Sequence, residues 1–231
     1  MNKLLVAGLP GSGKTHLILS LMAWVKAQGI SPAAFKPFEV AGIAHNATET
    51  PTDGERYAQM MSGEPLSTLI NPYIANEDYP VELAFRRDGI KMQPKLLADR
   101  QQILLENYGC LFVELPAGLA QPISETQDSL DWALEQEASI LYLIRPGTEQ
   151  FTETLLEIAR LKASGANFMF AFSNASDLKD GDWIFYQWEK LEAAAAQQAE
   201  GMLPHQKDPQ KLVQGMDQYL PKLTGLLLDK G

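Results

Sequence analysis

The chain has 231 residues, 45% of them hydrophobic, and a formal net charge of −10 at pH 7. This composition is sufficient for a large buried core and excludes a globally disordered chain, while the negative charge gives no general attraction to nucleic acid. The single cysteine, Cys110, excludes an internal disulfide and is usual in a reducing compartment. We therefore expect a cytoplasmic protein without nucleic-acid or membrane partners, because the first apolar stretch is too short and too interrupted by glycine to span a bilayer.

Short apolar runs alternate with helical patterns along the chain. Strands are expected at residues 3–8, 32–38, 110–115, 139–144 and 167–172, with a last short one at 202–204. Helices are expected at residues 15–29, 53–63, 94–109, 128–138, 148–166, 181–201 and 208–223. Continuous apolar strands separated by helices are typical of a parallel sheet covered on both faces. We therefore predict a three-layer α/β/α fold with a mostly parallel central sheet.

One segment differs in composition from the rest of the chain. No internal repeat or linker-like stretch interrupts the sequence, so we expect a single domain over residues 1–231. Within it, residues at about 38–93 form a long polar insertion that includes "TETPTDG" and "NPYIANEDYP". Because long, weakly regular insertions in compact domains are often functional, we expect this segment to contribute to a site.

A phosphate-binding motif follows the first expected strand and precedes the first expected helix. It reads "GLPGSGKT" from Gly8 to Thr15 and matches the P-loop pattern in the structural context that this pattern requires. Its glycines allow backbone N–H groups to turn toward phosphate oxygens, and the helix N-terminus adds partial positive charge. The sequence therefore predicts a P-loop NTPase-like fold that binds a nucleotide through these residues: Gly11, Ser12, Gly13, Lys14, Thr15 and, in the first helical turn, His16.

Three further charged residues are candidates for the same site. The Thr15 hydroxyl can ligate Mg²⁺, which usually requires a carboxylate as well. Glu114 closes the third expected strand and would face the crevice at the carboxyl edge of the sheet. Asp53 in "PTDGER" is a second candidate, although it could equally cap the helix that follows it. Lys36 ends a strand directly before Pro37 and would lie at the same edge, unless it is an ordinary exposed lysine.

In their order along the chain, these motifs resemble the dethiobiotin synthetase family, and the resemblance covers most of the chain. The matching elements are "AGLPGSGKT", "KPFEVAG", Asp53, the Asn71-Pro72-Tyr73 run, "FVELPAG", the Asp131-Trp132 pair, Asn174 in "FAFSNAS" and Pro204 in "MLPH". The resemblance implies that Asn174 and Pro204 lie near the adenine, although Asn174 would also suit a turn. It further implies that Thr15, Asp53 and Glu114 place Mg²⁺.

The resemblance also implies a reaction and its partners. In the family, diaminopelargonic acid reacts with CO₂ to form a carbamate, which attacks the γ-phosphoryl group of ATP, and the second amine then closes a ureido ring. Lys14 would stabilise the transferring phosphoryl group and Lys36 would hold the carbamate and phosphate oxygens, because such chemistry depends on charge neutralisation and alignment. The small molecules expected are diaminopelargonate, CO₂ and ATP, and the family acts as a homodimer.

The substrate side departs from the family pattern more than the nucleotide side does. The Lys-Pro motif is normally followed by a Ser or Thr that touches substrate, and here Val40 or Ala41 stands at that position. The loop after Glu114 is normally rich in glycine, and here it reads Leu115, Pro116 and Ala117. Side chains there crowd the approach to a ligand, and a proline removes one backbone donor. We still expect these loop residues, with Lys36 and Val40, to contact the substrate.

Two other functions are consistent with the same motifs. A small-molecule kinase would use the same phosphate loop, although an arginine-rich lid is absent apart from Arg86 and Arg87. A non-catalytic nucleotide-binding protein of the same fold would explain the altered substrate loops. Because function lies in the site and not in the fold, the three alternatives must be separated by their products and partners.

Overall fold

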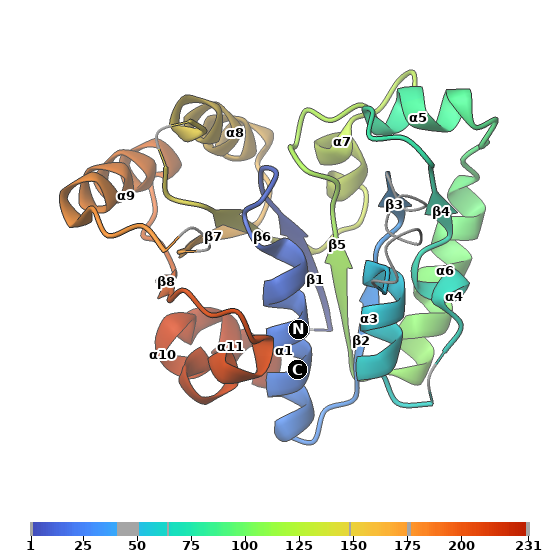
Figure 1. Cartoon of the computed structure of the whole chain (residues 1–231), viewed down its shortest axis with the longest axis horizontal. Helices are drawn as coiled ribbons and strands as arrows, with labels where there is room; N and C mark the ends of the chain where they lie inside the picture. The colour runs from blue at the N-terminus through green and yellow to red at the C-terminus, as the bar shows by residue number, and fades with distance from the viewer. Residues whose placement is uncertain (1, 41–50, 64, 148, 175–176, 230–231) are drawn as a thin grey trace.

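The computed structural model describes residues 2–40, 51–63, 65–147, 149–174 and 177–229. Its centre is a six-stranded parallel sheet with the strand order β2-β5-β1-β6-β7-β8 (Figure 1). The strands are β1 (Lys3–Ala7), β2 (Pro32–Phe35), β5 (Cys110–Glu114), β6 (Ser139–Ile144), β7 (Phe168–Ser173) and β8 (Met202–Leu203). The expected parallel sheet is confirmed, including the short last strand.

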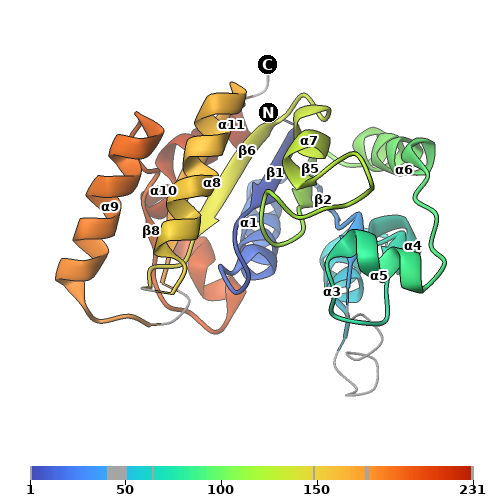
Figure 2. The same ribbon diagram turned by 90° about the horizontal axis from the view of Figure 1, so that it is seen from above.

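Helices cover the sheet in the three-layer arrangement that the sequence predicts. The longest are α1 (Lys14–Ala27), α6 (Pro94–Asn107), α8 (Phe151–Ser164) and α9 (Gly181–Ala195), and the shorter α7 (Ser129–Leu134) follows β5. Helices α8 and α9 pack side by side, as Figures 1 and 2 both show. Helix α1 packs against the C-terminal segment. In the described parts of the chain, no helix has the length and apolar character needed to cross a membrane.

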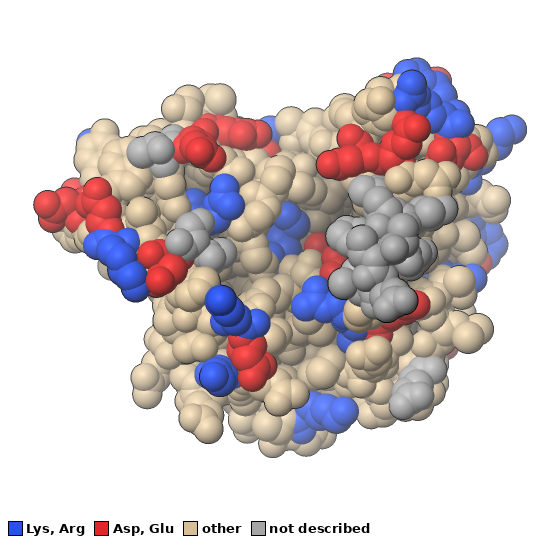
Figure 3. All heavy atoms as spheres, in the orientation of Figure 1, with Lys and Arg blue, Asp and Glu red and all other residues tan. Residues whose placement is uncertain are grey.

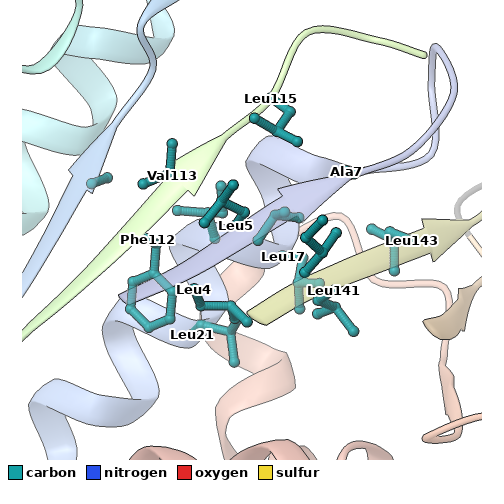
Figure 4. Close-up of a cluster of buried hydrophobic side chains, with 14 of the residues drawn as sticks. Leu4, Leu5, Ala7, Leu17, Leu21, Phe112, Val113, Leu115, Leu141 and Leu143 are labelled. Carbon is teal, nitrogen blue, oxygen red and sulfur yellow. The ribbon is translucent and has the colours of Figure 1, made fainter. Parts of the chain in front are cut away.

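The core lies where β1 meets its neighbours in the sheet. Leu5 of β1 is in register with Val113 of β5 on one side and Ile140 of β6 on the other, and all three are buried. Figure 4 shows this cluster, in which Leu17 and Leu21 of α1 lie against the sheet. The labelled residues of the cluster are Leu4, Leu5, Ala7, Leu17, Leu21, Phe112, Val113, Leu115, Leu141 and Leu143. Because β1 is central and buried on both faces, the loop that follows it starts from a rigid support.

The segment at 38–93 forms a small unit of its own beside the sheet. It contains β3 (Phe38–Glu39), α3 (Asp53–Met60), α4 (Ser67–Ile70), β4 (Tyr73–Ile74) and α5 (Val81–Arg87), with β3 and β4 paired in parallel. The second expected strand therefore ends earlier than predicted, because the chain leaves the main sheet after Phe35 and Pro37 cannot donate a ladder hydrogen bond. Ala41, one of the two residues expected at the substrate hydroxyl position, lies outside the described residues.

The helix expected over residues 208–223 is instead three short pieces. They are the 3₁₀ helix η1 (Pro209–Gly215), α10 (Met216–Tyr219) and α11 (Pro221–Leu228). Pro221 starts the last helix, at the position where a missing backbone N–H is tolerated. At Gly215, the last residue of η1, a Cβ would approach the ring of Tyr219 to 2.5 Å, so glycine is required here. Gly215 and Pro221 thus lie at the two boundaries between the three pieces.

Candidate active site

The phosphate loop follows β1 and ends at the N-terminus of α1. Gly8, Gly11 and Gly13 have φ angles of 148°, 71° and 92°, which glycine adopts without a steric penalty. A Cβ on Gly8 would lie 2.4 Å from the carbonyl oxygen of Leu143 at the end of β6. The glycines are therefore required by the left-handed backbone and by the close approach of the neighbouring strand.

Lys14 lies inside this loop. Its Nζ donates hydrogen bonds to the carbonyl oxygens of Gly8 at 2.9 Å and Leu9 at 3.3 Å, and the residue is 8% exposed. Burial lowers the pKa of Lys14, although the nearby Glu114 carboxylate acts in the opposite direction. Because the direct partners of this buried ammonium are neutral carbonyl oxygens, phosphate oxygens can replace them with a gain in charge complementarity.

Four side chains from distant parts of the sequence meet in front of the loop. The Thr15 hydroxyl oxygen lies 3.2 Å from Asp53 Oδ2 and 3.0 and 3.1 Å from the two carboxylate oxygens of Glu114. The Nζ of Lys36 lies 2.5 Å from Asp53 Oδ2 and 3.4 Å from Glu114 Oε1. Thr52 forms the capping box of α3 with Glu55, so the Asp53 side chain is free to face the site and is not needed as the cap.

The charges in this cluster support one another. Burial acts against the charged form of Lys36, but Glu114 and Asp53 outweigh it and raise the pKa of the ammonium. For Asp53, burial acts to raise the pKa, and the attraction of Lys36 together with its hydrogen bond lowers it overall. The buried Tyr57 donates a hydrogen bond to Glu114, and burial beside that carboxylate raises the pKa of the phenol. Asp53 is therefore held ionised with Lys36 as its counter-charge, and Lys36 also contacts Glu114.

This cluster has the chemistry of a magnesium site. Two carboxylates and one hydroxyl converge as hard oxygen donors, and they already hold a cation, the ammonium of Lys36. Among the described residues, no group of three or more His, Cys, Asp or Glu side chains is placed to hold a metal without other ligands. Two carboxylates and a hydroxyl therefore fit a Mg²⁺ ion only if it takes its remaining ligands from phosphate and water, which is how Mg²⁺ is usually bound.

A pocket of about 400 Å³ opens beside this cluster. Its lining includes every expected substrate residue, and the charged cluster lies at one end: Lys14, Lys36, Val40, Asp53, Glu114, Leu115, Pro116 and Ala117. Figure 3 shows the corresponding face hollowed near its centre, with side chains of both charges around the hollow. The structure thus brings the predicted phosphate, metal and substrate residues together, although they come from five separate segments.

The loop that follows β5 is braced by a carboxylate from α8. Glu157 accepts hydrogen bonds from the backbone N–H of Leu119 at 2.6 Å and from the Tyr142 hydroxyl at 2.5 Å. One residue earlier, the Gly118 N–H donates to the Gly8 carbonyl oxygen at 3.2 Å. Burial raises the pKa of Glu157. The wall of the pocket is therefore tied both to the phosphate loop and to the buried side of α8.

A second pocket has residues of the phosphate loop and of the first turn of α1 in its lining. Its lining includes Gly13, His16 and Pro204, as the sequence predicts, and adds Ser173 and His205. Among the described residues, His16 Nε2 and His205 Nδ1 are buried without a hydrogen-bond partner, and burial lowers the pKa of His16. Both imidazoles are therefore available to a ligand in this pocket.

Asn174 is placed differently from the other expected nucleotide residues. Its side-chain amide donates to the Leu178 carbonyl oxygen at 3.2 Å and accepts from the Leu178 N–H at 2.7 Å. The amide thus closes a turn after β7, and Ser173, its neighbour, lines the second pocket. An adenine contact by Asn174 would require this turn to open.

Three residues that contact or line the site were not predicted from the sequence, although the sequence pattern around two of them could have indicated their role. Tyr57 follows Asp53 by one helical turn, so the two side chains share a face of α3. Glu157 lies on the buried stripe of α8 with Ile158 and Leu161, where a carboxylate is unexpected. His205 carried no signal, because nothing local relates it to the phosphate loop.

The parallel sheet, the glycine-rich loop at the start of α1 and the Lys14–Thr15 pair define this chain as a P-loop nucleotide-binding protein. It belongs to the AAA domain family, since the family model (AAA_26) matches residues 2–205. Its similarity to ATP-dependent dethiobiotin synthetase of Bacillus cereus strain G9842 is 29% identity over 154 residues, which are 66% of this chain and 62% of that enzyme. The match thus spans less than two thirds of the length of the relative. The expected resemblance is confirmed.

Solved structures support the fold at greater distance. The septum site-determining protein MinD from Pyrococcus horikoshii, complexed with Mg-ADP, has a TM-score of 0.54 at 14% identity and covers 99% of both chains. The MinD cell division protein of Aquifex aeolicus has a TM-score of 0.50 at 13% identity, over 93% of this chain and 85% of that one. At this level of identity, the likeness concerns the fold alone.

Proposed function

We propose that this chain is an ATP-dependent cyclo-ligase of the dethiobiotin type, acting on diaminopelargonate and CO₂ with Mg²⁺. The observation that carries the proposal is the meeting of Lys14, Lys36 and the Thr15–Asp53–Glu114 donor set at one end of a single pocket. This arrangement suits the transfer of a phosphoryl group to a small anionic acceptor, since it supplies positive charge on both sides of the reacting oxygen.

Each residue then has a defined task in the reaction. Lys14 exchanges its carbonyl contacts for the β- and γ-phosphate oxygens of ATP. Lys36 binds the carbamate oxygen and aligns it with the γ-phosphorus, so that the P–O bond to ADP breaks as the bond to the carbamate forms. The second amine then attacks the carbamoyl carbon, losing a proton and expelling phosphate. Thr15, Asp53 and Glu114 would hold Mg²⁺, which supplies neutralisation of the phosphate charge when bound.

The pocket walls decide how the acceptor lies. Pro116 and Ala117 present apolar surface to the acceptor, and Val40 offers no hydroxyl. Leu115 also lines the pocket, but it is buried in the core. The orientation of the acceptor therefore depends on the charged residues of the pocket more than on backbone N–H donors. The hydrogen bond between the Leu119 N–H and Glu157 ties the loop that carries this wall to α8.

The direct test is turnover of the purified chain with diaminopelargonate, bicarbonate and Mg-ATP. The expected products are dethiobiotin, identified by mass spectrometry, and phosphate in equal amount. Lys14→Met and Lys36→Met are expected to abolish both products, whereas Lys95→Met, which removes an exposed helix ion pair with Asp99, leaves both unchanged. A stable phosphorylated acceptor would favour a kinase. Tight ATP binding without turnover, together with a nucleotide-dependent protein partner, would favour a binding module and refute the proposal.

Homodimer formation and a cytoplasmic location belong to the same proposal. Both are expected from the resemblance to dethiobiotin synthetases, and the similarity to the Bacillus cereus enzyme supports them. Sedimentation of the purified chain with and without Mg-ATP measures the oligomeric state, and a monomer under turnover conditions would refute the dimer.

A further inference from the structure

One buried carboxylate in the substrate pocket has no role in the proposed reaction. Glu39 is the last residue of β3, lines the pocket of about 400 Å³ and is 5% exposed. It lies on the same pocket as Lys36, Asp53 and Glu114, but none of the described ion pairs includes it. A charge in this position requires an explanation, because an ionised carboxylate is costly to bury without a cationic partner.

Glu39 is held firmly from both its backbone and its side chain. Its carbonyl oxygen accepts a hydrogen bond from the Ala75 N–H at 2.8 Å, and it is in register with Ile74 of β4. The side-chain amide of the buried Asn71 donates to Glu39 Oε2. The carboxylate is therefore fixed in one orientation before any ligand binds, as expected of a group that recognises a ligand.

The Lys36 charge attracts Glu39, but its close ion pairs are with other carboxylates. The Lys36 ammonium contacts Asp53 and Glu114, and the Lys14 ammonium is directed to the phosphate loop. Asn71, a neutral donor, is the hydrogen-bond partner of the Glu39 side chain within the described residues. When Mg-ATP binds in the proposed manner, Lys14 turns to phosphate and the other two carboxylates turn to the metal. Glu39 then remains as a fixed negative charge facing the acceptor.

The surroundings of Glu39 suit a positively charged nitrogen. Phe38 lines the same pocket, with its ring edge-on to Trp132 at a centroid distance of 5.5 Å. Asp78 and Tyr79 line it too. Carboxylates and aromatic rings together are the usual elements of ammonium recognition.

We propose that Glu39 is a specificity-determining residue that selects an acceptor with a protonated amine and orients it beside Lys36. The inference rests on the proposed function in one respect, namely that this pocket is the acceptor site. It adds that the acceptor is recognised through the charge of Glu39, since the substituted loop residues offer apolar surface. The chemical class of ligand is an aliphatic amine. A vicinal diamine satisfies it: one nitrogen forms the carbamate while Glu39 holds the other as an ammonium, which loses its proton before it closes the ring.

Calorimetry with the chain loaded with Mg²⁺ and a non-hydrolysable ATP analogue tests this inference. The probes are diaminopelargonate, 1,2-diaminopropane, its neutral counterpart 1,2-propanediol, and nonanoate, which lacks amines. Glu39→Gln keeps the size and the hydrogen bond to Asn71 but removes the charge. The matched control is Glu82→Gln, which removes a charge from the surface ion pair with Arg86 outside the pocket.

We expect Glu39→Gln to weaken both diamines by about ten- to hundredfold, the loss typical of a hydrogen bond to a charged group. Affinity for the ATP analogue should stay unchanged, and Glu82→Gln should behave as the unmodified chain. In the unmodified chain, 1,2-diaminopropane should bind and 1,2-propanediol should not, a comparison that holds even if the Gln variant fails to fold.

Equal binding of the diamine and the diol, or equal diamine binding by Glu39→Gln and the unmodified chain, would overturn the inference. Dethiobiotin formation in the same preparations separates this outcome from failure of the proposed function. Diamine binding that depends on Glu39 without dethiobiotin would refute the function and support the inference. Dethiobiotin formed equally well by the Gln variant would support the function and refute the inference.

Discussion

Removal of the Lys36 charge is expected to destabilise the folded chain by an amount that follows from its contacts. The Lys36 side chain is 14% exposed and contacts Asp53 and Glu114, whose side chains are 22% and 5% exposed. Breaking a buried ion pair from one side typically costs 3–5 kcal/mol, because the remaining charge stays buried, so the partial exposure of Asp53 reduces our estimate to about 2 kcal/mol. Arg56, Thr15 and Tyr57 still contact the carboxylates in Lys36→Met.

Thermal unfolding measures this change directly. For a chain of this length, about 2 kcal/mol corresponds to a decrease in Tm of roughly 4–8 °C. Lys95→Met is the matched control, because the Lys95–Asp99 pair is exposed (85% and 54%) and lies within one helix, where such pairs contribute less than about 0.5 kcal/mol. Mg²⁺ with an ATP analogue should reduce the deficit of Lys36→Met, since a divalent cation between the two carboxylates replaces the lost charge.

The pH dependence provides a second check on the same pair. The pKa of Asp53 is lowered in the folded chain, so the pair stabilises the fold at pH values above the unfolded pKa of about 3.9 and loses this effect as the pH falls through the folded pKa. The stability gap between the unmodified chain and Lys36→Met should therefore narrow in acid. An equal Tm for Lys36→Met and Lys95→Met at neutral pH would refute the reasoning, as would a gap that widens below pH 4.

Three further outcomes are expected. Glu39→Gln should raise the free energy of unfolding at neutral pH, because burial raises the pKa of Glu39 and its ionisation above that pKa costs stability; urea denaturation that shows no gain, or a loss, would contradict this. Cys110 is buried with a pKa raised to about 12 by burial, so a thiol reagent at neutral pH should label it only after unfolding, and rapid labelling of the native chain would contradict its placement. Gly8→Ala should abolish nucleotide binding, because its Cβ would meet the Leu143 carbonyl oxygen at 2.4 Å, whereas Gly181→Ala, with nothing within 4 Å, should bind ATP normally in equilibrium dialysis.

The outline of the fold could be predicted because each element carries its own signal. The strands of the main sheet are short apolar runs, and the periodicity of the helices between them is clear. The prediction was wrong at two places. The expected C-terminal helix is divided at Pro221, which starts a new helix and cannot donate a backbone hydrogen bond. The strand at Phe35 ends early because Phe38 pairs with Tyr73 in a second sheet.

By itself, the sequence determined the phosphate loop, since the loop is local: eight consecutive residues fix their own backbone, and β1 and α1 on either side orient it. Only the tertiary structure decided what the loop faces. Thr15 meets Asp53 and Glu114 across 38 and 99 residues of sequence, and no local pattern encodes those distances. The burial and the partners of Glu39 likewise depend on β3 leaving the main sheet and on Asn71 reaching it from the end of α4. The physical reason is that charge, burial and hydrogen bonding act through space, whereas a motif is defined along the chain.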